Sequence, residues 1–174
     1  MTPHGTRCFV LVRADGSKID ISFPHAVKLL PTIRSKGLIP QGLIDYRNAA
    51  RAAVQDQIHA FRDSALGASV VCPVSGEKLT RENYAVDHEI PMTFDQLLFN
   101  FSVERKVNPL TVNVGSIEGT VAIFSDGSLA QDWCKYHRAN AKLRLISRIA
   151  NMQLPKPRVV WDSICLGGCA EENA

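Results

Sequence analysis

The sequence predicts an α+β fold, in which an N-terminal β-hairpin and a long helix pack on a second region of short strands and helices. Residues 8–23, CFVLVRADGSKIDISF, contain two runs rich in β-branched and aromatic residues, joined by Asp15-Gly16. This pattern is a strong hairpin signal. Over residues 43–66 apolar side chains recur at spacings of three and four before Gly67. This spacing predicts one long amphipathic helix.

The remaining segments predict alternating short strands and helices. A short helix is expected over residues 25–30, and a strand over residues 84–90, YAVDHEI, which Pro91 ends. Capping-box patterns begin at Thr93 and at Ser128. The expected elements after Pro91 are a helix over 93–103, a strand over 120–124 and a helix from 128 to about 151. We expect three parts: a scaffold (1–66), a core (67–160) and a flexible tail (161–174).

The composition is that of an ordinary globular protein with one domain. The chain has 174 residues, of which 45% are hydrophobic, and a net charge of +3. It contains neither an apolar run of membrane-spanning length nor a signal-like start, so we expect a cytoplasmic protein with no membrane partner. Five scattered cysteines are a poor disulfide framework and suit a reducing compartment. Over residues 128–160, seven basic side chains oppose the single acid Asp132.

Three residues have the right types for metal-assisted hydrolysis. Asp87 and His88 end the predicted strand, and His137 lies on the predicted helix that follows. A carboxylate can hold a hard divalent cation, an imidazole can take a proton from water, and a second imidazole can complete the metal site. Asp87-His88 as a structural turn, and His137 as an ordinary core or surface histidine, are the alternatives.

These residues resemble the HNH (ββα-metal) nuclease superfamily. Val86-Asp87-His88-Glu89-Ile90-Pro91 is similar to its Asp-His-x-x-Pro signature, and residues 133–138, WCKYHR, are similar to its closing helix. The resemblance implies an HNH-like ββα-metal core over 67–160. It also implies Asp87 and His137 as metal ligands, His88 as general base, and a divalent metal such as Mg²⁺ as cofactor.

The chain departs from the family pattern at two places. Ser128 stands where the family has its middle asparagine, so Ser128 is either that polar residue or a helix cap. In the second case Asp126, Asn113 or Asn140 supplies the polar contact. Ser75 and Tyr136 stand where the family has the second cysteine of each zinc-binding pair, after Cys72 and Cys134. Two thiolates do not close a tetrahedral zinc site, so we expect packing around Trp133 and Tyr136 and no structural zinc.

The predicted function is a metal-dependent endonuclease that hydrolyses phosphodiester bonds of DNA, with RNA left open. Lys135, Arg138 and Lys142, spaced by three and four, are the expected phosphate contacts, although a charged helix face also serves solubility. A catalytically inactive HNH-like nucleic-acid-binding module is the first alternative, and a protein-interaction domain is the second. Separately, residues 8–23 resemble an uncharacterised domain of plant "defective chloroplasts and leaves" proteins and bacterial relatives.

Overall fold

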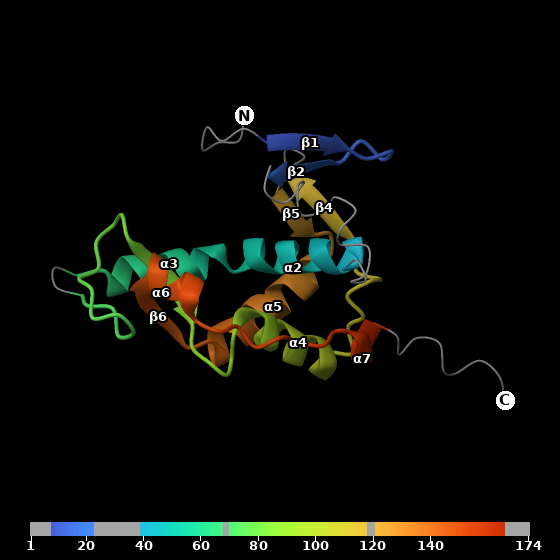
Figure 1. The fold of residues 1–174 in the computed structure, drawn as a ribbon. Helices are drawn as coiled ribbons and strands as arrows, with labels where there is room; N and C mark the ends of the chain where they lie inside the picture. Colours follow the sequence, from blue (N-terminus) through green and yellow to red (C-terminus); the bar gives the residue numbers. More distant parts are fainter. Residues whose placement is uncertain (1–7, 23–38, 68–69, 118–120, 166–174) are drawn as a thin grey trace.

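A computed structural model describes residues 8–22, 39–67, 70–117 and 121–165 and shows a mixed α+β fold, as the sequence predicts (Figure 1). The short helix expected over residues 25–30 lies outside the described residues. The elements are β1 (Cys8–Val12), β2 (Lys18–Ser22), α2 (Gln41–Ala53), α3 (Gln55–Ala65), β3 (Tyr84–His88), α4 (Phe94–Glu104), β4 (Val114–Ile117), β5 (Val121–Phe124), α5 (Gly127–Asn140), β6 (Leu143–Ser147), α6 (Arg148–Gln153) and α7 (Asp162–Cys165).

The N-terminal hairpin is confirmed. Strands β1 and β2 pair antiparallel, with Val12 opposite Lys18. Asp15 Oδ1 accepts hydrogen bonds from the backbone and the hydroxyl of Ser17, at 2.9 and 2.7 Å. Gly16 has φ +80, a left-handed conformation that glycine adopts without strain. An ion pair between Arg13 and Asp45, 3.0 Å long, attaches the hairpin loop to helix α2.

The prediction of one long helix over residues 43–66 is wrong in one detail: the structure has two helices, α2 and α3, which meet at Val54. Val54 has φ −100 and ψ 4, which ends α2, and its carbonyl then accepts the amide hydrogens of Gln57 and Ile58. The side chain of Val54 is 1% exposed. The apolar spacing continues through this break, so the sequence pattern contains no sign of it.

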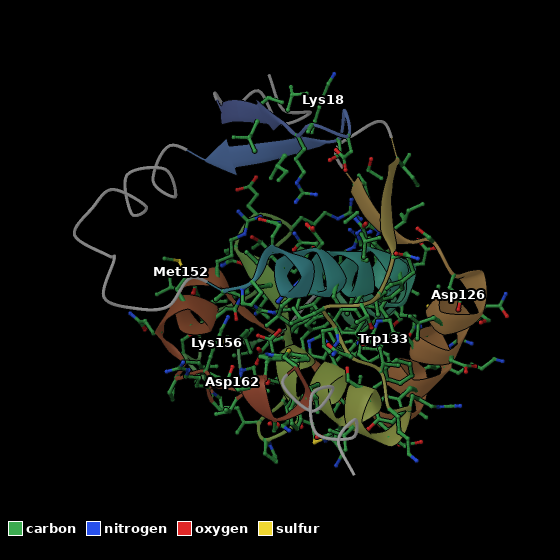
Figure 2. All side chains as sticks on the ribbon, turned by 90° about the vertical axis from the view of Figure 1, so that its right-hand side faces the viewer. Lys18, Asp126, Trp133, Met152, Lys156 and Asp162 are labelled. Atoms are coloured by element: carbon green, nitrogen blue, oxygen red, sulfur yellow. The ribbon has the colours of Figure 1, made fainter. Side chains whose placement is uncertain are left out.

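The main core lies between α2, α4, α5 and β5. In Figure 1, α2 crosses the middle of the molecule, with β4 and β5 on one side and α4 and α5 on the other. Tyr46, Phe101 and Trp133 are fully buried, and Trp133 lies in the interior in Figure 2. The Trp133 indole donates a 2.9 Å hydrogen bond to the carbonyl of Ala50. The buried main core therefore contains α2, from the predicted scaffold (1–66), together with helices from the predicted second part (67–160).

Helix α4 begins where the sequence predicts, whereas α5 does not begin at Ser128. The Thr93 hydroxyl accepts the amide hydrogen of Gln96 and caps α4. At α5 the cap is Asp126, whose carboxylate accepts hydrogen bonds from the amides of Ser128 and Leu129. Asp126 is the better acceptor here because it is charged and lies at the positive end of the helix. The expected strand over 120–124 is β5, and it pairs with β4, which the sequence does not predict.

The prediction of a single helix from 128 to about 151 is wrong. Helix α5 ends at Asn140, Ala141 is extended with ψ 130, and β6 and α6 follow. The side chains of Leu145 and Ile146 are buried in a second apolar cluster with Cys72, Leu79 and Ala150. Backbone pairing with β3 and this burial favour a strand over further helix. Apolar residues at 143, 145, 146, 149 and 150 fit both periods, so the sequence pattern is ambiguous there.

The second cluster holds a small unit of two strands and a helix. Strand β3 pairs antiparallel with β6, and α6 follows β6 directly. Residues 89–142, which include α4 and α5, connect the two strands. The predicted tail begins at Trp161, whose side chain is 8% exposed in the main core, and residues 166–174 lie outside the described part. None of the described helices is both long and apolar enough to cross a membrane.

Candidate active site

His88 lies at the end of β3, where that strand leaves the sheet. In the β3–β6 register His88 stands opposite Leu143, and Asp87 stands opposite Arg144. Side chains alternate between faces along a strand, but His88 is the last residue of β3, and Asp87 and His88 both border one pocket. The backbone amide of Glu89 donates to the carbonyl of Lys142 at 2.9 Å and so extends the pairing past His88.

The structure brings His88 and His137 together. Their Nε2 atoms are 2.9 Å apart, although the residues are far apart in sequence. His137 lies on α5 and is 1% exposed. Its other ring nitrogen, Nδ1, is 2.9 Å from the side-chain oxygen of Gln57 on α3. The interior packing that places α5 against α2 and α3 therefore also places His137 behind His88.

Asp87 has a different partner. Arg144 donates two hydrogen bonds to Asp87 Oδ2, from Nε at 3.0 Å and from an Nη atom at 2.8 Å. Both ring nitrogens of His137 are occupied by Gln57 and His88. Asp87 and His137, the expected metal ligands, therefore have different partners and do not contact each other. The expected proximity of His88 and His137 is present.

The environment keeps both imidazoles neutral near neutral pH. Burial, together with the neighbouring His88, lowers the pKa of His137 to about 4. Burial also lowers the pKa of His88; Arg51 acts in the same direction, and the carboxylates of Asp87 and Asp95 oppose it. A neutral imidazole has one unprotonated nitrogen, which is the form that a general base needs.

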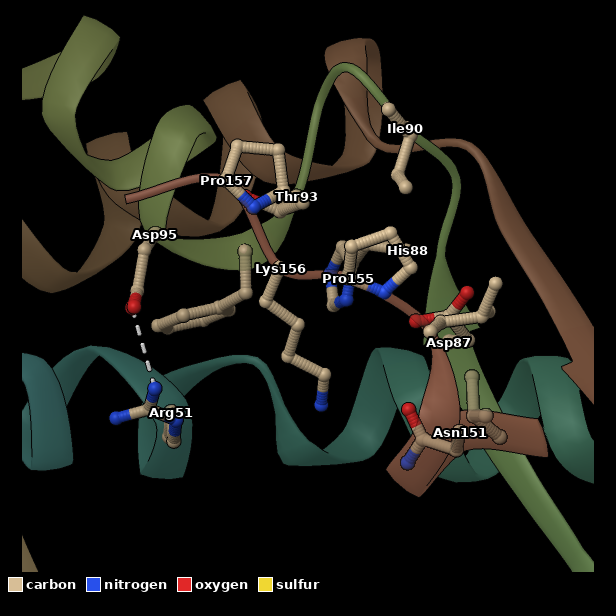
Figure 3. A pocket seen from close by; sticks show the side chains of 13 residues that line it. Arg51, Asp87, His88, Ile90, Thr93, Asp95, Asn151, Pro155, Lys156 and Pro157 are labelled. Atoms are coloured by element: carbon tan, nitrogen blue, oxygen red, sulfur yellow. Dashed lines mark hydrogen bonds and ion pairs between the residues drawn. The ribbon is translucent and has the colours of Figure 1, made fainter. Parts of the chain in front are cut away.

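A pocket of about 220 Å³ opens beside His88 (Figure 3). Asp87 and His88 line it from β3, and Asn151 lines it from α6. Arg51 and Lys156 contribute cationic side chains to the same pocket. Arg51 lies 4.6 Å over the Phe94 ring and is 3.2 Å from an oxygen of Asp95. No ion pair is formed by Lys156 among the described residues.

The sequence pattern does not single out Arg51, Asn151 or Lys156 as site residues. Asn151 falls at the end of the helix that is predicted from 128 to about 151, and Lys156 follows that helix. Ser147 accepts the amide hydrogen of Ala150 and so caps α6. An apolar strand-length run before such a capping serine is the signal that predicts a strand and a new helix. That helix, α6, carries Asn151 into the pocket with Asp87 and His88.

The predicted phosphate contacts lie elsewhere. Lys135, Arg138 and Lys142 are exposed, and none of the three lines the pocket beside His88. Arg138 lines a second, open hollow, together with His137, Asp56 and Gln57. Ser128 donates its hydroxyl hydrogen to Asp126 at 2.7 Å and also lies outside the pocket. Asn113 and Asn140 are not among the pocket residues either.

The two cysteines compared with the family's zinc-binding pairs, Cys72 and Cys134, lie in different clusters. Cys134 donates to the carbonyl of Ala53 at 3.1 Å in the main core, whereas Cys72 is buried in the second cluster. The Cys72 sulfur accepts the amide hydrogens of Ser75 and Ser147, at 3.4 and 3.2 Å. Burial raises the pKa of Cys72, but hydrogen bonds from Ser75 and Ser147 outweigh it and lower the pKa to about 6.

Two turns therefore face each other around Cys72. The first runs from Cys72 to Ser75, and the second from Ser147 to Ala150, where α6 begins. The hydroxyls of Ser75 and Ser147 are 3.3 Å apart. Of the four residues that begin and end these turns, Cys72, Ser75, Ser147 and Ala150, one has a thiol. The two turns are therefore held together by hydrogen bonds and apolar packing. Trp133 and Tyr136 stack with each other in the main core instead of filling this place.

The pocket offers oxygen ligands for a cation, but few of them. Across the described residues, no group of three or more His, Cys, Asp or Glu side chains is arranged to hold a metal ion. Asp87 Oδ1 carries no hydrogen bond from Arg144, and Asn151 brings a side-chain amide to the same pocket. One carboxylate and one amide oxygen, completed by water and a substrate phosphate, fit the oxygen-rich, partly hydrated site that Mg²⁺ prefers.

Comparison with known proteins adds one short match. A family described as "Protein of unknown function (DUF3223)", the plant-type domain that the hairpin sequence resembles, matches residues 1–27. The match covers the β1–β2 hairpin and stops before α2. No curated protein matches the chain, and neither does any solved structure.

Proposed function

We propose that the protein is a metal-dependent endonuclease that hydrolyses phosphodiester bonds of DNA in the pocket beside His88. One observation supports this proposal above the others: Asp87, His88 and Asn151 line one pocket at the open end of a strand–strand–helix unit. The order of β3, β6 and α6 is similar to the strand–strand–helix order of the HNH unit, whose signature the Asp-His-x-x-Pro segment resembles. In this proposal α6 takes the place that the sequence analysis gives to α5.

Each pocket residue has a chemical task in the proposed reaction. His88, neutral and half-buried, accepts a proton from the attacking water. Asp87 and Asn151 would hold a divalent cation, with Asn151 in place of His137. When bound, such an ion stabilises negative charge on the scissile phosphate and on the leaving oxygen. Arg51 and Lys156 attract the phosphates of the substrate into the pocket.

The alternative, an inactive module that binds nucleic acid, is favoured by the Asp87–Arg144 ion pair. Arg144 donates both of its hydrogen bonds to one oxygen of Asp87, and the Asp87 side chain is only 14% exposed. A carboxylate that is paired in this way binds a cation less strongly than a free one. Binding without cleavage is the behaviour that this pairing predicts.

Nicking of supercoiled plasmid with Mg²⁺ and with EDTA tests the proposal. Active protein converts the plasmid to the open circle with Mg²⁺ only. His88→Ala reduces the rate by about 10²–10⁴-fold. His59→Ala, an exposed histidine on α3, is the matched control and retains the rate. Asn151→Ala reduces cleavage, whereas Met152→Ala, the 85% exposed neighbour, does not.

The outcomes separate the candidates. Binding in a gel shift that weakens with salt, without nicking and unchanged in His88→Ala, supports the inactive module. Neither binding nor nicking overturns both nucleic-acid functions. Circular dichroism of each variant shows that the fold is retained.

A further inference from the structure

Three side chains form a continuous hydrogen-bonded chain behind the pocket. The Gln57 amide nitrogen is 2.9 Å from the backbone carbonyl of Cys134. The Gln57 oxygen is 2.9 Å from His137 Nδ1, and His137 Nε2 is 2.9 Å from His88 Nε2. The three residues come from α3, α5 and β3, so the chain crosses from the main core to the pocket.

The position of each proton in this chain follows from its fixed end. A backbone carbonyl only accepts, so Gln57 must direct its NH₂ group at Cys134 and its oxygen at His137. An amide oxygen also only accepts, so His137 carries its hydrogen on Nδ1. A neutral imidazole has one N–H, so His137 Nε2 is an acceptor, and His88 must donate from its Nε2.

The remaining nitrogen of His88, Nδ1, is then the one with the lone pair. None of the described residues forms a hydrogen bond with it. Every buried side-chain nitrogen or oxygen of the described residues has a partner, so His88 Nδ1 is reached by solvent. His88 borders the pocket that Asp87, Asn151 and Lys156 also line.

We infer that Gln57 and His137 are positioning residues, which hold His88 as the Nε2–H tautomer and leave its Nδ1 lone pair accessible to solvent. The use of that lone pair as a base rests on the proposed function, whereas the tautomers do not. In this inference His137 orients His88 through the hydrogen bond between their Nε2 atoms and does not bind the metal. Because a free imidazole in water exchanges between two tautomers, a hydrogen bond of this kind decides which nitrogen is available.

The tautomers are measured by ¹⁵N–¹H correlation NMR on the full chain labelled with ¹⁵N-histidine, near neutral pH. In the wild type His137 shows a protonated Nδ1 and a bare Nε2, and His88 shows the reverse. His59, exposed on α3, is the reference for an unconstrained ring. A His137 proton on Nε2, or a His88 proton on Nδ1, overturns the inference without any variant.

Two substitutions of similar volume test the effect of His137 on His88. His137→Gln keeps an acceptor near the position of the ring Nε2, whereas His137→Leu does not. We expect His88 to remain the Nε2–H tautomer in His137→Gln and to show an average of both tautomers in His137→Leu. Unchanged His88 signals in His137→Leu overturn the inference.

Plasmid nicking then separates this inference from the proposed function. His137→Leu should lower kcat by roughly 10–100-fold with little change in KM, as for partners that orient a reacting group, and His137→Gln should restore part of it. If the tautomers are as stated but the wild type does not cleave, the proposed function fails and the hydrogen-bonded chain stands. If the wild type cleaves and His137→Leu cleaves equally well, the inference fails and the function stands.

Discussion

Acid should destabilise this protein strongly because of His137. The ring is 1% exposed, is hydrogen-bonded at both nitrogens as a neutral group, and has a pKa lowered from 6.5 to about 4. In the unfolded chain the same residue titrates with its ordinary pKa. Between these two values the unfolded state binds more protons than the folded state, so stability is lost as the pH falls.

The magnitude follows from the two pKa values. Each unit of difference is worth about 1.4 kcal/mol, so the complete effect is about 3 kcal/mol. Between about pH 7 and pH 4.5, where most of the unfolded protonation has occurred, the expected loss from this residue is about 2 kcal/mol. For a chain with a stability of about 5–15 kcal/mol, this loss is readily measured.

Urea unfolding at the two pH values, followed by the fluorescence of the buried Trp133 and Trp161, measures the loss. Carboxylates and other histidines also titrate in this range, so the comparison is with His137→Gln, which removes one titrating group. The loss should be about 2 kcal/mol smaller in that variant. His59→Gln, which removes an exposed imidazole from α3, is the control for the substitution itself. An equal loss in wild type and His137→Gln would refute the reasoning.

Three further outcomes are expected. Thr93→Ala removes the cap of α4 and should lower the free energy of unfolding by about 1 kcal/mol in a urea titration; an unchanged midpoint contradicts the capping role. Lys156→Ala should weaken DNA binding and reduce the slope of log affinity against log salt concentration by about one, whereas an unchanged slope places Lys156 outside the DNA contact. Joint replacement of Ser75, Ser147 and Ala150 by cysteine should create, with Cys72, a tetrahedral site that binds Zn²⁺ and gives the visible absorption of thiolate-bound Co²⁺. The absence of that absorption contradicts the facing of the two turns.

Local signals in the sequence predict much of the fold. Asp15-Gly16 fixes the hairpin because its turn chemistry needs no distant partner. Thr93 caps α4 for the same reason. The strand that ends at His88 has β-branched and aromatic residues before a proline. Each of these elements depends on a few consecutive residues, so one sequence is enough to find it.

The parts that depend on tertiary contacts are not predictable in this way. The apolar residues of 143–150 fit a helix or a strand, and only pairing with β3 decides for a strand. The placement of Asn151 and Lys156 in the pocket follows from that choice. The likeness to a known nuclease pattern does lead to His137. Its contact with His88 and Gln57 requires the helix packing of the main core, which no local pattern contains.

The packing of α5 explains why His137 has a fixed position. Trp133 and His137 are one helical turn apart, so they share one face of α5. On that face the Trp133 indole binds the carbonyl of Ala50, and Cys134 binds that of Ala53. Gln57 lies one helical turn further along, on α3, and its side chain binds the carbonyl of Cys134 and the ring of His137. Residues 89–142 are thus more than a connection between β3 and β6. They supply helix α5, which packs in the main core and whose His137 contacts the His88 ring at the edge of a small two-stranded sheet.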